Sequence, residues 1–269
     1  MTQYNIIAES QEYTVVAEYD HVTTPAESYQ SEADLEKELI RLLGEQGYEY
    51  LPIHTEADLV KNLRSQLEKL NSYHFTDNEW TRFFSECIAN KNDDIVVKTS
   101  KIQDDYIQVL RRDTGESRNI WLIDKDNIHN NFVQVINQYV EEGGNHDTRY
   151  DVSILVNGLP LVHIELKRRG VQLKEAFNQI NRYQRDSFWA GCGLYEYVQI
   201  FVISNGTNTK YYSNTTRANH IKEQETGGRN KSKKTSNSFE FSSFWADSNN
   251  KVITDLLDFT KTFFSKHTL

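Results

Sequence analysis

The sequence predicts an α/β protein in which helices flank a central mixed sheet, with additional helices in the N-terminal part. The 269 residues, 38% of them hydrophobic and 12% aromatic, can bury a sizeable core. Leucines recur at helical spacing in the first hundred residues, whereas later apolar runs are short and bounded by turn residues. Only three prolines interrupt the chain, which favours long, regular elements.

We expect a single domain over residues 1–269. Residues 1–100 form its mostly helical part, and residues 101–216 form its core sheet. A mobile loop follows over 217–238 and a C-terminal helix over 239–269. No internal repeat is visible. The loop is expected because the stretch is polar and carries a Gly-Gly pair followed by basic residues.

Capping signals and leucine spacing predict three early helices. Ser31 is a good N-cap and Asp34 the matching N3 acid for a helix over 32–45, which Gly47 ends. Leucines at positions 59, 63, 67 and 70 predict a second helix over 56–70. A third is expected over 77–89, after Thr76 as a cap.

Strands are expected in the middle of the chain. Short runs rich in apolar and β-branched residues predict them, at 106–110, 120–123, 132–139, 151–156, 161–167, 197–204 and 210–213. Two amphipathic patterns predict further helices, over 173–186 and 252–264.

Charge and cysteine content restrict the class of protein. A net charge of −9 argues against a surface coated in basic residues for duplex binding, although a local basic patch suffices to bind nucleic acid. No apolar run is long enough to span a membrane, and the N-terminus lacks the pattern of a signal peptide. Cys87 and Cys192 fit free buried thiols in a reducing compartment. We therefore expect a cytoplasmic protein without a membrane partner.

The most informative stretch is residues 150–167, two apolar-rich strands joined by Asn157-Gly158. A plain two-residue turn places Asp151 opposite Ile164, on the other sheet face from Glu165. A shift of one residue pairs Asp151 with Glu165 and leaves the second face entirely apolar. We predict the shifted pairing, supplied by a bulge near Pro160, which cannot donate to a ladder.

In the shifted pairing, Asp151, Glu165 and Lys167 converge. Two neighbouring carboxylates repel each other, and a divalent cation offsets this repulsion; oxygen ligands, with the carbonyl of Leu166 as a third, select Mg²⁺ or a similar hard ion. Lys167 would activate water and stabilise charge on a phosphorane-like transition state. The pattern indicates metal-assisted phosphodiester hydrolysis. The alternative is a surface hairpin whose charges form solvated ion pairs.

A polar pair on the next expected helix supports a site. Gln179 and Tyr183 are four residues apart and share one helical face. Beside a metal site they would hold a phosphate or a base edge. The alternative is an ordinary amphipathic helix.

Together these residues resemble a known family. Asp151, Glu165-x-Lys167 and Gln179-x-x-x-Tyr183 are similar to the PD-(D/E)xK nuclease superfamily and its RecB-like branch. More closely, the chain resembles the N-terminal endonuclease domain of the restriction subunit of type I restriction-modification enzymes, the type IC group especially. The resemblance runs through nearly the whole chain, at residues 28–36, 156–161, 175–180, 203–207 and 266–269.

The resemblance implies a role for each site residue. Asp151 and Glu165 would bind the metal, and Lys167 would serve the attacking water. Gln179 and Tyr183 would position DNA or support the site. An acid on the first helix would join them, with Glu32 and Glu36 as the two candidates. Tyr150 stands where the family has proline, which changes a turn preference and no ligand.

The implied function is that of a type I site-specific deoxyribonuclease, a Mg²⁺-dependent domain that cuts foreign double-stranded DNA when an ATP-driven motor stalls. The motor domains are absent, and no phosphate-binding G-x-x-x-x-G-K-[ST] loop occurs, so we expect a fragment of a larger subunit that lacks ATPase activity of its own. Modification and specificity subunits are the expected partners. The alternative is a non-catalytic domain on a nuclease fold that docks the motor or holds DNA.

Several other features have two interpretations. His129-Asn130-Asn131 resembles part of an HNH nuclease motif but fits a polar turn better. His163 would tune the site or be an ordinary strand histidine. The basic residues 229–234 would contact DNA phosphates or a motor domain, or form a solvated loop. The four tryptophans fit core or interface positions.

Overall fold

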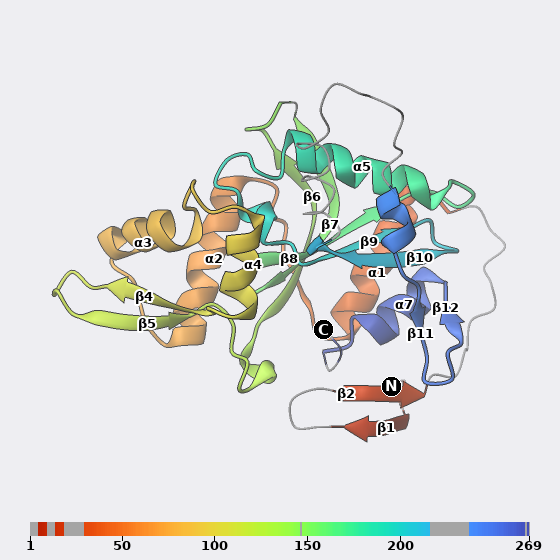
Figure 1. Ribbon diagram of the computed structural model, residues 1–269, viewed down its shortest axis with the longest axis horizontal. Helices are drawn as coiled ribbons and strands as arrows, with labels where there is room; N and C mark the ends of the chain where they lie inside the picture. The colour runs from red at the N-terminus through yellow and green to blue at the C-terminus, as the bar shows by residue number, and fades with distance from the viewer. Residues whose placement is uncertain are drawn as a thin grey trace. The chain divides into compact units, whose positions relative to one another are not determined.

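The expected fold class is confirmed by the computed structural model, which describes residues 5–9, 14–18, 30–145, 147–215, 237–266 and 268 (Figure 1). It is a mixed α/β structure whose central six-stranded sheet is flanked by helices, in the strand order β10-β9-β8-β7-β6-β3. The strands are β3 (Glu49–Tyr50), β6 (Val133–Glu141), β7 (Thr148–Val156), β8 (Leu159–Leu166), β9 (Ile200–Ser204) and β10 (Thr209–Ser213).

The sheet combines both strand senses. β3 runs parallel to β6, while β6–β7 and β9–β10 are antiparallel pairs. β8 and β9 run in the same direction, since Gln199 N donates to Leu161 O near their start and Lys167 N donates to Ser204 O near their end. β8 is buried along its whole length, as expected for a central strand.

The chain divides into two compact units, which we describe separately. Unit 1 comprises Met1–Tyr48, Ile164–Ile180 and Ile200–Leu269. In it, α1 (Glu32–Glu45) contacts α7 (Leu256–Phe263), and the expected capping box of Ser31 and Asp34 is formed. Two further hairpins belong to this unit, β1 (Asn5–Glu9) with β2 (Thr14–Glu18) and β11 (Trp245–Ala246) with β12 (Val252–Ile253).

The expected helix over 252–264 was too long at its start. Val252 and Ile253 pair with β11, and the helix begins at Leu256 because the Asp255 carboxylate accepts a hydrogen bond from Leu257 N as its N-cap. By contrast, α5 (Leu173–Asp186) has the expected bounds. The loop expected at 217–238 and the basic residues 229–234 lie outside the described residues, except that 237 and 238 open a 3-10 segment (Asn237–Phe241).

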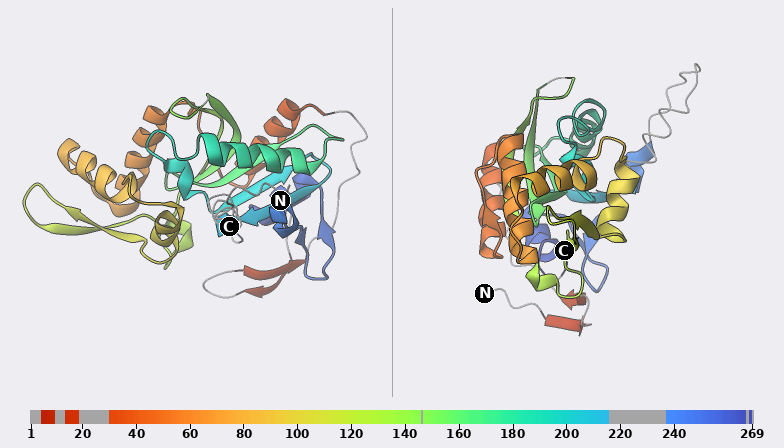
Figure 2. Two further views of the ribbon diagram at one scale, coloured as in Figure 1. Left: turned by 45° about the horizontal axis from the view of Figure 1, so that its top comes forward. Right: turned by 90° about the vertical axis from the view of Figure 1, so that its left-hand side faces the viewer.

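Unit 2 comprises Glu49–His163 and Asn181–Gln199. It contains α2 (Glu56–Asn71), α3 (Asp77–Phe83), α4 (Ile95–Gln103) and the hairpin of β4 (Ile107–Arg111) and β5 (Ser117–Trp121). This hairpin lies alongside α3 in Figure 2 and forms a separate two-stranded sheet. The expectation that all strands after residue 101 join one core sheet was therefore wrong for these two.

Two helical details of unit 2 also differ from expectation. The third helix ends at Phe83 and continues as a π-helical turn, Phe84–Ile88. Helix α4 was not expected, because its valines favour strands; Asp94 nevertheless starts it by accepting hydrogen bonds from Val96 N and Val97 N. The run expected as a strand from 197 begins with a 3-10 segment, Leu194–Tyr197.

The Asn-Gly turn of the β7–β8 hairpin is confirmed. Asn157 and Gly158 have φ of 51° and 85°, as a two-residue type I′ turn requires. Asn157 is fully buried, and its amide group bonds Leu122 O, Asn131 Oδ1 and Phe132 N. A Cβ on Gly158 would lie 2.6 Å from the Cα of Leu63, so the turn packs directly on the α2 backbone.

For several single residues, the structure favours one of the two interpretations. His129 lies in a 3-10 turn, Ile128–Asn130, where the Asn130 amide donates to Asp124, so the polar-turn interpretation is favoured. Trp80 is buried, but Trp121 and Trp189 are 44% and 47% exposed. Both cysteines are free thiols that are partly rather than fully buried.

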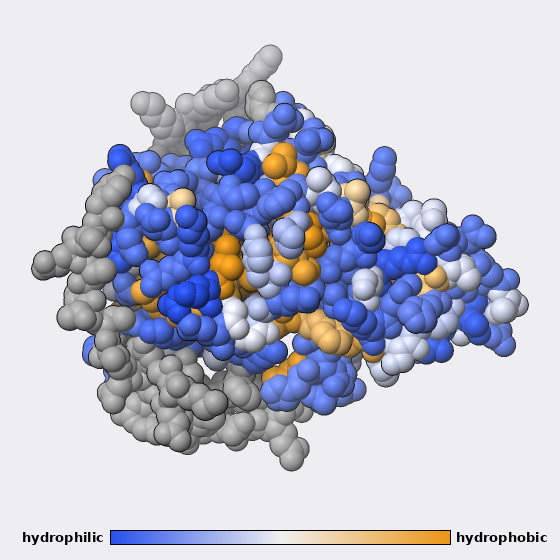
Figure 3. Space-filling view, turned by 180° about the vertical axis from the view of Figure 1, so that it is seen from behind, coloured by the Kyte–Doolittle hydropathy of each residue, from blue (hydrophilic) through white to orange (hydrophobic). Residues whose placement is uncertain are grey.

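The surface is consistent with the mean hydropathy of −0.68. On the face shown in Figure 3, hydrophobic residues form small groups among polar ones. In the part of the chain that the structure describes, no helix is long and apolar enough to cross a membrane.

Candidate active site

The end of strand β8 carries a buried carboxylate paired with a lysine. Glu165 is fully buried, and its Oε1 lies 2.9 Å from Nζ of Lys167, whose side chain is 13% exposed. The same ammonium donates to the carbonyl oxygen of Leu166 at 3.0 Å. Residues two apart in a strand point to the same side, which brings the acid and the base together as the sequence predicts.

Two of the expected metal ligands therefore converge on one positive charge. The Lys167 ammonium contacts Glu165 Oε1, a side-chain oxygen, and Leu166 O, the backbone oxygen of the next residue. Oxygens arranged in this way suit a hard cation. The described residues contain no group of three or more His, Cys, Asp or Glu side chains assembled as a metal site, so a hard cation here would also need carbonyl or water oxygens.

Helix α1 brings an acid to the segment after β8. Glu32 Oε1 accepts a hydrogen bond from Arg168 N at 3.2 Å, although 136 positions separate the two. Arg169 donates to Gln30 Oε1 and to Thr207 Oγ1, which fixes the same segment to the chain before α1 and to the turn after β9. Glu36 lies one helical turn from Glu32 and is partly buried. Glu32 therefore contacts the segment after β8, and the choice between Glu32 and Glu36 as the site acid stays open.

Asp151 lies in β7 and is partly buried. The β6–β7 register pairs Asn137 with Val152 and Tyr139 with Tyr150, which places Gln138 across from Asp151. Gln138 has φ of 52°, and among the described non-glycine residues with positive φ it alone lies inside a strand. Strained backbone of this kind is typical of functional sites. No sequence pattern points to Gln138, because a glutamine in a strand has no distinguishing pattern.

The one-residue shift of the β7–β8 pairing stays a prediction. The turn at 157–158 is the plain two-residue turn, whose closing pair is Val156 and Leu159. A shift that pairs Asp151 with Glu165 must therefore arise within the strands, beyond the turn.

Gln179 and Tyr183 lie on α5 as expected. Gln179 is partly buried, whereas Tyr183 is 7% exposed and donates from its hydroxyl to Arg149 O at 3.1 Å. Tyr183 belongs to a buried aromatic cluster of unit 2 whose members are Tyr139, Tyr150, His163, Tyr183, Phe188 and Tyr195. Its role in this cluster is structural, and its role toward DNA stays a prediction.

The aromatic cluster also explains Tyr150 and His163. Tyr150 lies at its centre and donates to Ser187 Oγ at 2.7 Å; burial raises the pKa of its hydroxyl. His163 is fully buried and contacts Tyr150 and Phe188 edge-on. Tyr150 thus fixes the strand position that precedes Asp151 through packing. His163 is better explained as a packed strand histidine than as a group that tunes the site.

Comparisons with known proteins show the family of this chain. Residues 29–220 match the family described as type I restriction enzyme R protein N terminus. The chain is 48% identical over 264 residues to the type I restriction enzyme EcoprrI endonuclease subunit of Escherichia coli, covering 98% of this chain and 79% of that protein. It is 37% identical over 242 residues to the SsaAORF53P endonuclease subunit of Staphylococcus saprophyticus, covering 87% of this chain and 23% of that protein.

A third relative is also a similar endonuclease subunit. The SauCOLORF180P endonuclease subunit of Staphylococcus aureus is 40% identical over 192 residues, which cover 70% of this chain and 20% of that protein. The chain thus spans most of one relative and about a fifth of two others. With its family match and these identities, the chain belongs to the family of type I restriction enzyme R proteins, and it carries their N-terminal region.

Proposed function

We propose that this chain is the DNA-cutting domain of a type I restriction enzyme, a Mg²⁺-dependent endonuclease that hydrolyses phosphodiester bonds. The relatives are named endonuclease subunits, and the family match covers the residues of the candidate site. The observation that carries the proposal is the convergence of Glu165 Oε1 and Leu166 O on the Lys167 ammonium, within 2.9 and 3.0 Å. A buried carboxylate beside a partly accessible lysine suits a site that a cation and a phosphate enter.

The roles follow from the chemistry of the side chains. Asp151, Glu165 and the carbonyl of Leu166 would hold the ion. When bound, a divalent ion offsets the charge of the carboxylates and of the phosphodiester. Lys167 would orient the attacking water and stabilise the charge that develops on the phosphate oxygens. Glu32 would hold the segment after β8 in place through Arg168 N.

Several finer features belong to the same proposal. The substrate would be double-stranded DNA, and cutting would follow the stalling of an ATP-driven motor in the full-length subunit. Gln179 and Tyr183 would position the DNA or the site. Modification and specificity subunits would supply recognition, and the complex would act in the cytoplasm. For the chain alone we expect little or no cleavage, because cutting would depend on the motor.

The decisive experiment substitutes Asp151→Ala in the full-length subunit and measures cleavage of unmodified plasmid DNA by the reconstituted complex. We expect cleavage to fall by about 10³-fold or more, since removing one residue of a cooperating site removes most of its rate enhancement. Asp126→Asn is the matched control: it removes an exposed carboxylate of unit 2 and should leave cleavage unchanged.

DNA binding by each variant is measured in parallel. If the Asp151→Ala complex cuts DNA as fast as the unchanged complex, the nuclease proposal is wrong. Persisting DNA binding in that case would instead support a domain that holds DNA or docks the motor. Loss of cleavage with retained DNA binding and ATP hydrolysis would place the defect in the chemical step.

A further inference from the structure

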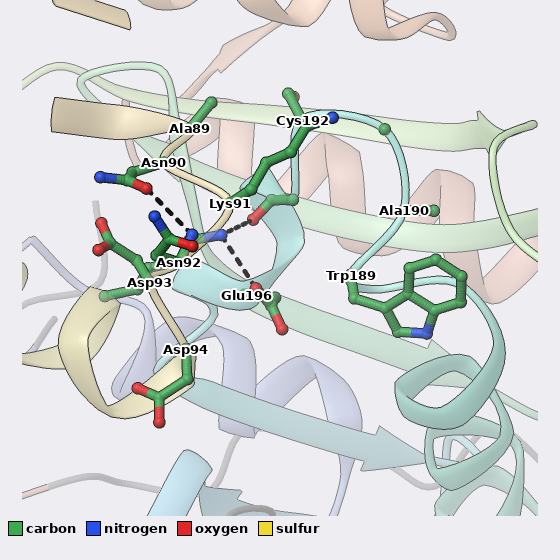
Figure 4. Close-up of a pocket in the computed structure, with 13 residues that line it drawn as sticks. Ala89, Asn90, Lys91, Asn92, Asp93, Asp94, Trp189, Ala190, Cys192 and Glu196 are labelled. Atoms are coloured by element: carbon green, nitrogen blue, oxygen red, sulfur yellow. Dashed lines mark hydrogen bonds and ion pairs between the residues drawn. The ribbon is translucent and has the colours of Figure 1, made fainter. Parts of the chain in front are cut away.

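Unit 2 contains a pocket that none of the proposed nuclease residues lines. Its volume is about 510 Å³, which is large enough for a nucleoside. Two segments form it, the loop 89–94 before α4 and the turn 189–193 after α5, with Lys98 and Glu196 between them. Figure 4 shows Trp189 on one side, the Asn90–Asp94 segment on the other and Glu196 between.

A buried ion pair holds the two sides of the pocket together. The side chain of Lys98 is only 3% exposed, and its ammonium lies 2.9 Å from both Glu196 Oε2 and the carbonyl oxygen of Gly193. Gly193 has φ of 64°, and a Cβ there would lie 2.8 Å from the Lys98 ammonium. The lysine therefore joins the two segments of the pocket, and the positive φ of Gly193 is a conformation that glycine adopts readily.

A second contact fixes the turn at its other end. Glu56 Oε2 accepts a hydrogen bond from Cys192 N at 2.8 Å. Gly191 has φ of 57°, and a Cβ on it would lie 1.8 Å from the same carboxylate oxygen. Burial raises the pKa of the Cys192 thiol to about 12, so the thiol stays protonated at neutral pH. The turn is pre-organised, and its cysteine is unsuited to metal or redox chemistry.

Trp189 provides an exposed aromatic surface at the rim. The residue is 47% exposed, and its indole N–H donates to Arg185 O at 2.9 Å, which fixes the ring relative to the end of α5. A large aromatic ring held in place and left in contact with water is the usual platform for a stacked base.

The acids of the pocket are already engaged. Asp93 pairs with Lys101, Asp94 caps α4 through Val96 N and Val97 N, and Glu196 pairs with Lys98. Their negative charge is therefore offset or used by the fold. Asn90 is engaged as well, since its amide donates to Glu86 O and accepts from Asn92 N. Asn92 and Lys91 remain on the rim, as one amide that both donates and accepts hydrogen bonds and one exposed ammonium.

We propose that this pocket binds a nucleotide, with the base stacked on Trp189, its polar edge toward Asn92, and a phosphate near Lys91. A flat π-face, an amide for a base edge and one cation match this class of ligand. The nucleotide could belong to an unpaired DNA strand or be free in solution. The inference concerns a binding site distinct from the cleavage chemistry and does not depend on the nuclease proposal.

The test measures binding of a fluorescein-labelled single-stranded dT decamer to the full chain by anisotropy, in EDTA so that no cleavage occurs. Unlabelled ATP and dAMP serve as competitors. We expect Trp189→Ala to weaken binding roughly 5- to 150-fold, the range for loss of one stacked base. Trp189→Phe, which keeps a ring, should stay within about 5-fold of the unchanged chain. Trp121→Ala removes the other strongly exposed tryptophan of unit 2 as the matched control and should have no effect.

Each outcome either supports or overturns the nucleotide site. Weakening by Trp189→Ala alone, with no competition by ATP or dAMP, supports a strand site. The same weakening with competition by ATP or dAMP supports a free-nucleotide site. If the decamer and the mononucleotides do not bind at 1 mM, or if Trp121→Ala weakens binding as much as Trp189→Ala, the proposal is wrong. Circular dichroism of all variants confirms that the fold is retained.

Discussion

Two lysine–glutamate pairs of the same length have opposite burial. At the end of β8 the acid is fully buried and Lys167 is the more accessible partner; in the pocket Lys98 is buried and Glu196 is 18% exposed. Both pairs measure 2.9 Å. Lys167 is the more accessible of the two lysines, so we expect a metal ion to be able to take its place beside Glu165. Lys98 is nearly closed to water and joins two segments, so we expect no such exchange there.

The largest expected effect tests the Lys167–Glu165 pair at the end of β8. Lys167→Met should reduce DNA cleavage by the reconstituted complex by about 10²- to 10⁴-fold, the usual contribution of a group that assists proton transfer. Lys98→Met in the same assay should leave the cleavage rate per folded molecule nearly unchanged. Rates are normalised to the folded fraction measured by circular dichroism. Equal losses in the two variants would remove the distinction between them.

The second effect concerns stability and metal. Either substitution removes the ammonium beside a buried or partly buried carboxylate, and breaking such a pair destabilises proteins by roughly 3–5 kcal/mol. We expect Mn²⁺ or Mg²⁺ to restore much of this loss in Lys167→Met, because the ion replaces the ammonium beside Glu165, and to restore none in Lys98→Met. Thermal unfolding with and without the ion measures this. Rescue of both variants, or of neither, would contradict a metal site at β8.

The sequence indicated these two regions to different degrees. The β8 pair could be predicted because Glu165 lies in the strand and Lys167, two positions on, directly follows its end, so a common side follows from spacing alone. The Lys98–Glu196 pair joins residues 98 positions apart, across a helix that was not expected at all. Local patterns do not reveal such long-range pairs, since neither lysine nor glutamate is unusual in its own segment.

The fold shows the same contrast. The bounds of α1 and α5 follow from caps and from apolar periodicity, which are local. The separation of β4 and β5 from the central sheet depends on which strands meet, which periodicity does not determine. The Asn-Gly turn was correctly placed, but its packing on the backbone of Leu63 needed the structure. The contact of Glu32 with Arg168 N, 136 positions away, likewise could not be read from local spacing.

The smallest expected effect tests the strain at Gln138, across β6–β7 from Asp151. In an ordinary strand interior alanine is more stable than glycine by roughly 0.5–1 kcal/mol. At φ of 52° the order should reverse, so that Gln138→Gly is more stable than Gln138→Ala by about 1 kcal/mol. Urea unfolding of the two variants measures the difference, and because both remove the same side chain, lost contacts cancel. Gln134→Gly and Gln134→Ala, in the same strand without positive φ, should keep the usual order. If the alanine variant at 138 is the more stable one, the backbone beside Asp151 is unstrained, and nothing distinguishes Gln138 from its neighbours.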